Sequence, residues 1–132
     1  MAKTILVVED NPTDMEILCY FLEMYKYEVI RAKNAEEALW ITNTILPDLV
    51  VADIKLPGID GIELTNRLKK EESTKNIPVI AVTAHDMRGE EKNLFKWGFN
   101  GYVSKPISKK RILNTVKLFL PSEEEPTEEE PK

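Results

Sequence analysis

The sequence predicts an α/β protein built on a doubly wound, five-stranded parallel sheet with helices on both faces. Five short apolar segments of strand length alternate with segments in which apolar residues recur every three or four positions. This alternation indicates parallel strands, because parallel neighbours need a crossover connection. Five strands are too few for an eight-stranded barrel, so an open sheet remains.

The predicted strands fall into two groups. Continuous apolar runs occupy residues 5–8, 49–52 and 79–82, which is the pattern of strands buried on both faces. Two shorter apolar pairs, at 29–30 and 102–103, stand in more polar surroundings. In open sheets of this kind, chemistry takes place at the carboxyl ends of the strands. The residues that follow each run are therefore the first candidates for a functional site.

Capping residues mark where the first helices begin. Asn11 can cap the first helix, with Pro12 at the first helical position, where its missing N–H costs nothing. Asn34 can cap the second, with Glu37 three positions later as in a capping box. The apolar positions that define the five helices are Met15, Leu18, Cys19 and Leu22; Ala35, Ala38, Leu39 and Thr42; Ile62, Leu64 and Leu68; Leu94, Phe95 and Trp97; and Ile107, Ile112, Val116 and Leu120.

The later helices have boundaries of the same kind. Asp60 opens the third helix as a favourable N-cap residue. Gly98 ends the fourth helix, and either Pro106 or Ser108 begins the fifth.

The composition indicates one globular domain. The chain has 132 residues, of which 42% are hydrophobic and 31% charged, and this argues against global disorder. No apolar run approaches the roughly 20 residues of a membrane span, and the first strand begins too early to leave room for a signal peptide. The single cysteine, Cys19, excludes an internal disulfide and a multi-cysteine metal site. These features predict a cytoplasmic protein without membrane insertion.

The net charge of −5 comes entirely from the C-terminal end. Residues 122–132 contain six Glu and one Lys, whereas residues 1–121 contain 17 acidic and 17 basic residues. We expect a folded domain at residues 1–120 and an acidic, disordered tail at 121–132. The overall charge weighs against direct nucleic-acid binding, which needs a basic face.

Polar residues stand at the ends of four predicted strands. Glu9 and Asp10 follow the first strand, Asp53 the third, Thr83 the fourth and Lys105 the fifth. Three carboxylates at one edge would raise one another's pKa values, and a hard cation such as Mg²⁺ relieves that repulsion. Each residue alone is more simply a helix cap or a surface side chain. Together they suit a phosphoryl group, whose oxygens the ammonium and hydroxyl groups would contact.

Other chemistries lack their motifs in this sequence. It contains neither of the glycine-rich loops G-x-x-x-x-G-K-[ST] and G-x-G-x-x-G, which cradle nucleotide phosphates. It also lacks the G-x-S-x-G elbow of hydrolases, and the only histidine, His85, has no nucleophile and acid arranged around it.

Four segments of the chain carry a family resemblance. ILVVEDN, DLVVADIKLPGIDGIEL, IPVIAVTAH and GYVSKPI resemble, in order and spacing, the receiver domains of two-component response regulators, including the single-domain chemotaxis and sporulation-relay types. The resemblance runs from about Lys3 to Leu120. It implies a flavodoxin-like fold with strand order 2-1-3-4-5 and five helices. It also implies a signalling switch that takes a phosphoryl group from a histidine kinase or a histidine phosphotransfer protein, and that catalyses only its own phosphorylation and dephosphorylation.

The resemblance implies a role for each matching residue around a Mg²⁺ ion. Asp53 matches the phosphoacceptor, and Asp10 matches a direct ligand of the ion. Glu9 stands where many members have Asp, and its longer side chain suits a contact through water. The backbone carbonyl of Lys55 would supply another ligand.

The resemblance also implies a switch. Lys105 would pair with phosphate oxygens, and its bond to Pro106 is expected to be cis. Thr83 would move toward the new phosphate, and the Tyr102 ring would enter the space it leaves. The surface of the fourth helix, fifth strand and fifth helix would then change shape for a downstream protein target.

Two finer predictions concern the rate of dephosphorylation and the docking of the phosphodonor. Lys55 and His85 would flank the approach of an attacking water, and neither is suited to orient it, so self-dephosphorylation should be slow. Ile17, Tyr20 and Met24 would form an apolar stripe on the first helix, opposite its core-facing side, where the phosphodonor could dock.

Alternatives remain open at this point. The domain could be an interaction module that kept the fold without being phosphorylated, although the complete set of strand-end residues favours phosphorylation. A flavin-binding electron carrier of similar architecture would need a Ser/Thr-rich phosphate loop after the first strand, which this chain lacks. The chain is either a stand-alone phosphorelay protein or a receiver excised from a larger regulator or hybrid kinase.

Overall fold

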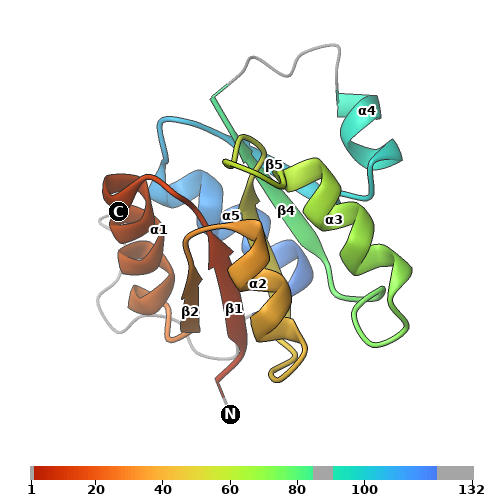
Figure 1. Cartoon of the computed structure of the whole chain (residues 1–132). Helices are drawn as coiled ribbons and strands as arrows, with labels where there is room; N and C mark the ends of the chain where they lie inside the picture. The colour runs from red at the N-terminus through yellow and green to blue at the C-terminus, as the bar shows by residue number, and fades with distance from the viewer. Residues whose placement is uncertain (1, 85–90, 122–132) are drawn as a thin grey trace, which may run out of the picture.

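Strands and helices alternate along the chain as predicted (Figure 1). The computed structural model describes residues 2–84 and 91–121, and the predicted acidic tail lies outside them except for Pro121. The elements within the described residues are β1 (Thr4–Val8), α1 (Pro12–Met24), β2 (Glu28–Ala32), α2 (Ala35–Thr42), β3 (Leu49–Asp53), α3 (Gly61–Lys70), β4 (Val79–Thr83), α4 (Glu91–Lys96), β5 (Gly101–Ser104) and α5 (Lys109–Phe119).

The strands form one parallel sheet in the order β2-β1-β3-β4-β5, which confirms the predicted topology. The order reverses at β1, whose neighbours are β2 and β3. Val8 pairs with Ala52, and Asp53 pairs with Val82. The carboxyl ends of β1, β3 and β4 therefore lie next to one another.

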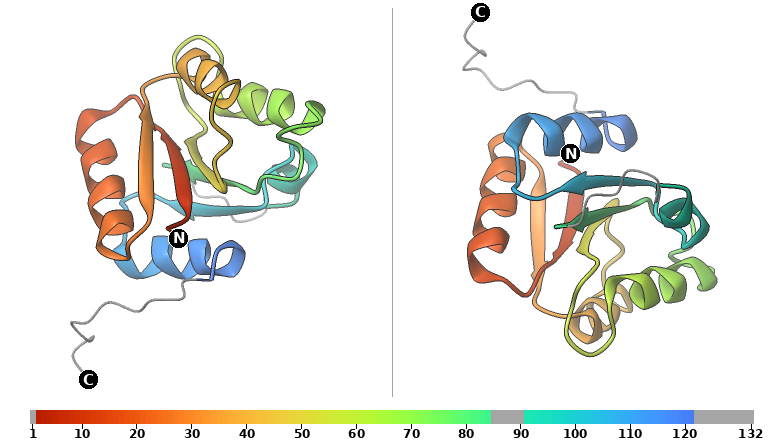
Figure 2. Two further views of the ribbon diagram at one scale, coloured as in Figure 1. Left: turned by 90° about the horizontal axis from the view of Figure 1, so that it is seen from below. Right: turned by 90° about the horizontal axis from the view of Figure 1, so that it is seen from above.

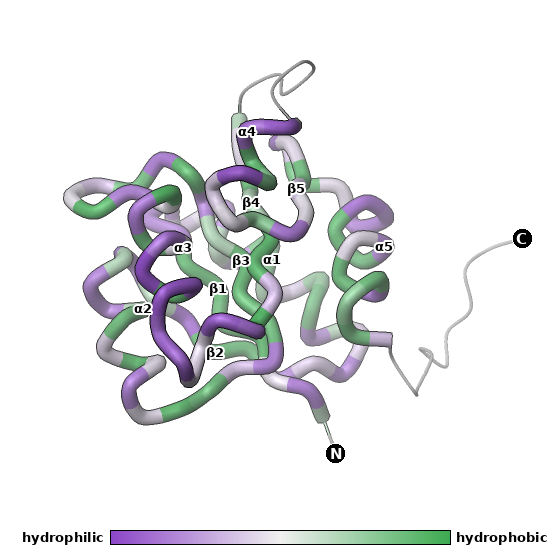
Figure 3. Tube along the Cα trace, turned by 90° about the vertical axis from the view of Figure 1, so that its right-hand side faces the viewer, coloured by the Kyte–Doolittle hydropathy of each residue, from purple (hydrophilic) through white to green (hydrophobic). Residues whose placement is uncertain are grey.

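Helices cover both faces of this sheet (Figure 2). α1 and α5 pack on one face, and α2, α3 and α4 pack on the other. Successive strand residues contribute to opposite layers, so Ile5 and Val7 join the α1–α5 side while Leu6 and Val8 join the other. The hydropathy along the chain follows this arrangement: the central strands are largely apolar, whereas polar and apolar residues alternate along the helices (Figure 3). Such burial on both faces explains the continuous apolar runs in the sequence.

The predicted caps are present. Asn11 Oδ1 accepts a hydrogen bond from the Asp14 N–H at 2.9 Å, and Asn34 Oδ1 accepts one from the Glu37 N–H at 2.7 Å. The Glu37 carboxylate in turn accepts from the Lys33 N–H at 2.7 Å, which completes a reciprocal cap. Further along, Asp60 caps α3, and Ser108 rather than Pro106 caps α5.

The fourth helix buries less of its apolar sequence than the others. Leu94 is 1% exposed, but Phe95 is 56% exposed and Trp97 is 37% exposed. The helix ends at Lys96, so Trp97 lies beyond it, and the chain turns at Gly98 with a φ of +103°. No helix in the described part of the chain has both the length and the apolar character needed to cross a membrane.

Candidate functional site

Three carboxylates meet at the carboxyl end of the sheet. Glu9 and Asp10 directly follow β1, and Asp53 is the last residue of the adjacent strand β3. One carboxylate oxygen from each lies within 4.8 Å of the others. Glu9 is 1% exposed and Asp53 is 6% exposed, whereas Asp10 is open to solvent. The acidic group predicted from the strand ends is therefore assembled, with one member facing outward.

Lys105 brings a positive charge into this acidic group. Its Nζ lies 3.0 Å from Asp53 Oδ2 and 3.3 Å from Glu9 Oε1. The backbone helps to place it, because the Lys105 N–H donates to the Thr83 carbonyl oxygen at 2.7 Å. The Lys105–Pro106 peptide bond is cis, as the family resemblance implied.

Asp14 also contacts Lys105, which no pattern in the sequence indicated. Asp14 lies in the first turn of α1, and its Oδ2 is 2.8 Å from Lys105 Nζ, which is the shortest of the three ion pairs that Lys105 makes within residues 2–84 and 91–121. An acidic residue in the first turn of a helix is common, because it interacts favourably with the helix dipole. The position of Asp14 in the sequence is thus explained by the helix alone, and it does not reveal the ion pair with Lys105.

The segment after Asp53 folds tightly against the end of β3. The Lys55 N–H donates to Asp53 Oδ1 at 3.1 Å, so both carboxylate oxygens of Asp53 have partners. Gly61 closes this loop by donating its N–H to the Ile54 carbonyl oxygen at 2.8 Å. A Cβ at Gly61 would lie 2.3 Å from the Asp53 carbonyl oxygen, which no side chain can accommodate. Glycine is thus required here for a close approach that the sequence pattern alone did not reveal.

The charged form of Glu9 is unfavourable in the folded protein. Burial raises the pKa of Glu9 from an ordinary 4.5 to about 7, and the charge of Asp53 adds to this, while the Asn11 N–H and Lys105 oppose it. Among the described residues, Glu9 Oε1 has no hydrogen-bond donor. A buried carboxylate oxygen without a donor, beside two further carboxylates, is the donor set that a hard divalent cation prefers. The residues present therefore fit Mg²⁺.

Burial and the neighbouring carboxylates also shift the pKa of Lys105. Burial alone would lower the pKa of Lys105. The hydrogen bonds to Asp14 and Asp53, together with the negative charges of Asp53 and Glu9, outweigh burial and raise that pKa above its usual value. Lys105 therefore remains a cation throughout the physiological range.

Thr83 and Tyr102 occupy neighbouring strands. Thr83 ends β4 next to Asp53 and is 1% exposed. Tyr102 is half-buried on β5 and packs against the core layer under α2, α3 and α4. It pairs with Ala81, two positions before Thr83 on the adjacent strand. The switch roles of Thr83 and Tyr102 stay predictions.

The other predicted residues are Lys55 and His85, expected to control dephosphorylation, and Ile17, Tyr20 and Met24, expected to dock the phosphodonor. Lys55 is exposed, and His85 lies outside the described residues. On α1, Tyr20 is 64% exposed, but Ile17 is only half-buried rather than open. Met24 packs against the core layer under α1 and α5, so the prediction that it faces away from the core is wrong. Phe21, three positions earlier on α1, packs against this layer as well.

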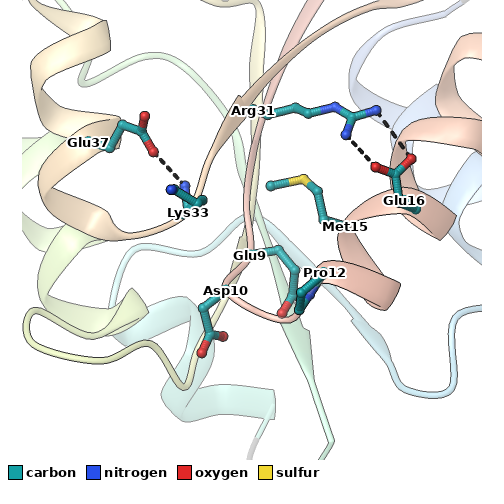
Figure 4. A pocket seen from close by; sticks show the side chains of 8 residues that line it. All are labelled: Glu9, Asp10, Pro12, Met15, Glu16, Arg31, Lys33 and Glu37. Carbon is teal, nitrogen blue, oxygen red and sulfur yellow. Dashed lines mark hydrogen bonds and ion pairs between the residues drawn. The ribbon is translucent and has the colours of Figure 1, made fainter.

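A hollow of about 380 Å³ opens beside the acidic group, between the start of α1 and the end of β2 (Figure 4). It gives solvent a path toward Glu9 and Asp10. An ion pair of 2.7 Å between Arg31 and Glu16 lies on its wall. The lining residues are Glu9, Asp10, Pro12, Met15, Glu16, Arg31, Lys33 and Glu37.

Comparison with curated proteins identifies similar single-domain regulators. The chain is 42% identical over 120 residues to the polar-differentiation response regulator DivK of Brucella anthropi, and the match covers 91% of this chain and 98% of that protein. DivK of Brucella ovis matches over the same length with the same identity.

Solved structures agree in fold. A putative response regulator from Chloroflexus aurantiacus J-10-fl superposes with a TM-score of 0.86 at 36% identity, covering 91% of this chain and 98% of that one. The receiver domain of the sensor histidine kinase PA1611 from Pseudomonas aeruginosa PAO1, with a magnesium ion coordinated in its active-site cleft, gives 0.82 at 26% identity over the same shares. Residues 5–117 match the model of the response regulator receiver domain family. With its strand order and its acidic strand ends, this chain belongs to the family of response regulator receiver domains, the signalling switches of two-component systems.

Proposed function

We propose that Asp53 accepts a phosphoryl group from a phosphohistidine, on a sensor kinase or a histidine phosphotransfer protein, and that this switches the protein. The observation that carries the proposal is the position of the Asp53 carboxylate. It is held between the Lys55 N–H and Lys105 Nζ, beside Glu9 and Asp10, at the open edge of the sheet.

The residues proposed to hold Mg²⁺ are Asp10 and Asp53 directly, Glu9 through a water, and the backbone carbonyl of Lys55. When bound, the ion would neutralise charge on the carboxylates and on the phosphoryl oxygens. The Lys55 peptide is already adjacent, because its N–H donates to Asp53. A cation at this position is supported by the buried Glu9 oxygen, for which the described residues supply no hydrogen-bond donor.

The transfer step needs little beyond positioning. An Asp53 carboxylate oxygen forms a bond to phosphorus while the bond from phosphorus to the imidazole nitrogen breaks. The electron pair of that bond returns to the imidazole, which takes up a proton from solvent. Lys105 stabilises the charge on the transferred group because its ammonium group already lies 3.0 Å from Asp53 Oδ2.

The proposed switch follows from the added charge. A phosphoryl group brings roughly two negative charges near neutral pH. The Thr83 hydroxyl then gains an acceptor and moves toward it, and the Tyr102 ring follows into the space vacated. The surface formed by α4, β5 and α5 changes shape, and a downstream protein reads the change.

We also propose where the protein acts and in what kind of signalling system. The protein acts in the cytoplasm as a phosphorelay or signalling switch, with no activity on other substrates. The similarity to DivK over nearly that protein's whole length supports a stand-alone regulator over a receiver within a larger regulator or hybrid kinase. Slow self-dephosphorylation, controlled at Lys55 and His85, would suit such a relay.

Intact-mass measurement after incubation with acetyl phosphate tests the proposal. The wild-type protein with Mg²⁺ should gain one phosphoryl mass, and it should gain none when the metal is chelated. Asp53→Asn should remain unlabelled. Asp48→Asn is the matched control, since Asp48 precedes the same strand at its other end. A wild-type protein that is never labelled would favour the unphosphorylated interaction module, and a labelled Asp53→Asn variant would remove Asp53 from its role.

A further inference from the structure

The ammonium group of Lys105 has three N–H donors, and three carboxylates of the described part of the chain lie around it. Its Nζ lies 2.8 Å from Asp14, 3.0 Å from Asp53 and 3.3 Å from Glu9. Lys105 is therefore surrounded by carboxylates before any phosphoryl group arrives, with Asp14 and Asp53 as its close partners and Glu9 Oε1 at ion-pair distance without accepting a hydrogen bond from it. A phosphoryl oxygen that binds Lys105 has to share or replace one of these neighbours.

Asp14 differs from the other two neighbours in its surroundings. Glu9 and Asp53 are buried and belong to the proposed metal site, so a cation can compensate their charges. The side chain of Asp14 is 25% exposed, so water can solvate it when Lys105 turns away. Its backbone is held in place by the cap, because the Asp14 N–H donates to Asn11 Oδ1.

We propose that Asp14 is a competing counterion, which draws Lys105 toward α1 in the unphosphorylated protein and opposes its pairing with the phosphoryl group. This inference rests on the proposed function of Asp53. Asp14 does not touch the reacting atoms and acts through Lys105, so it is a positioning residue. Its charge favours the resting state, and its removal should make the site more receptive to an anion.

The competition predicts opposite effects on two ligands of the same site. Asp14→Asn keeps the shape and an acceptor oxygen but removes the charge. Without that charge, Lys105 pairs more fully with an anion at Asp53, so the affinity for fluoroberyllate at saturating Mg²⁺ should rise about threefold to tenfold. In the absence of fluoroberyllate, the freed lysine repels a cation more strongly, so Mg²⁺ should bind less tightly. A merely structural role for Asp14 would weaken both ligands together.

Isothermal titration of the full chain, first with Mg²⁺ and then with fluoroberyllate, measures both affinities. Glu23→Gln is the matched control, because it removes one negative charge from an exposed position near the other end of α1 and should change neither affinity. Unchanged or weaker fluoroberyllate binding by Asp14→Asn would overturn this inference and leave the proposed function standing. A wild-type protein that binds Mg²⁺ but no fluoroberyllate would overturn both.

Discussion

Lys69 and Lys105 are both half-buried, and they lie at opposite ends of the same sheet. At the amino end, Lys69 Nζ donates to the Ile77 carbonyl oxygen at 2.8 Å and to Asn100 Oδ1 at 3.0 Å. These acceptors are neutral, so burial prevails and lowers the pKa of Lys69. At the carboxyl end, the partners of Lys105 are carboxylates, and its pKa is raised despite the burial.

The polar groups at the two ends of the sheet differ in whether every acceptor has a hydrogen-bond donor. At the amino end each of these acceptors has a donor: Asp48 accepts from the Thr4 N–H at 2.8 Å, and Asn100 Oδ1 accepts from the Val79 N–H at 2.9 Å as well as from Lys69. At the carboxyl end, among the described residues, three carboxylates share Lys105, and one oxygen of Glu9 has no hydrogen-bond donor. The polar groups of the amino end stabilise the fold, whereas the carboxyl end carries an excess of negative charge that a cation can compensate.

The largest expected effect is on the free energy of unfolding, when Lys105 or Lys69 is replaced by an uncharged residue. In metal-free protein, Lys105→Met should lower the free energy of unfolding by about 3 kcal/mol, because it leaves buried carboxylates without a counterion. Lys69→Met should cost only about 1 kcal/mol, because it removes hydrogen bonds to neutral acceptors. Urea unfolding with a chelator measures both variants. Equal losses would mean that the two ends do not differ as described.

Next in size is the effect of removing the buried charge of Glu9. The folded protein holds a proton on Glu9 up to about pH 7, whereas the unfolded chain releases it near 4.5, so stability falls as the pH rises through this interval. Glu9→Gln should therefore stabilise the metal-free protein by about 2 kcal/mol at pH 8, and by little at pH 4.5. Unfolding experiments at the two pH values decide this, with Glu23→Gln as the exposed control. A pH-independent difference would contradict the assigned cause.

Mg²⁺ affinity should separate the two charges at the carboxyl end. Asp10→Asn removes a proposed ligand and should weaken Mg²⁺ binding about tenfold. Lys105→Met removes a neighbouring positive charge and should leave the affinity unchanged or raise it. Isothermal titration of the folded variants measures both. If Lys105→Met lost Mg²⁺ and still took up phosphate normally, the roles given to these residues would have to be exchanged.

The smallest expected effect concerns the lifetime of the phosphorylated protein. Lys55→Asn, alone and together with His85→Gly, should accelerate loss of the phosphoryl group severalfold, because an amide can orient the attacking water and a smaller side chain opens its path. The decay of the phosphorylated mass after removal of acetyl phosphate gives the rate. Unchanged decay in both variants would show that neither position controls the water.

Much of the site was predictable because its residues stand at strand ends. Apolar runs locate the strands, and a parallel sheet brings their carboxyl ends to one edge, so Glu9, Asp10, Asp53 and Lys105 were expected together. The packing on α1 and α4 was less predictable. Periodicity identifies which residues share a helix face, but it cannot say whether Met24 or Phe95 finds a neighbour to pack against.

The sequence by itself determined the fold class, the caps of the first helices and the acidic strand ends, because these depend on local patterns and on general rules of chain connection. Only the tertiary structure decided which partners share Lys105, how closely Gly61 approaches Asp53, and which oxygen of Glu9 finds no donor among the residues described. Asp14 and Lys105 lie far apart in the chain and meet only when α1 and the end of β5 come to the same edge of the sheet. The physical reason is that the residue type alone specifies the charge of a side chain. The electrostatic energy of that charge depends on which other charges the folded chain brings within a few ångströms.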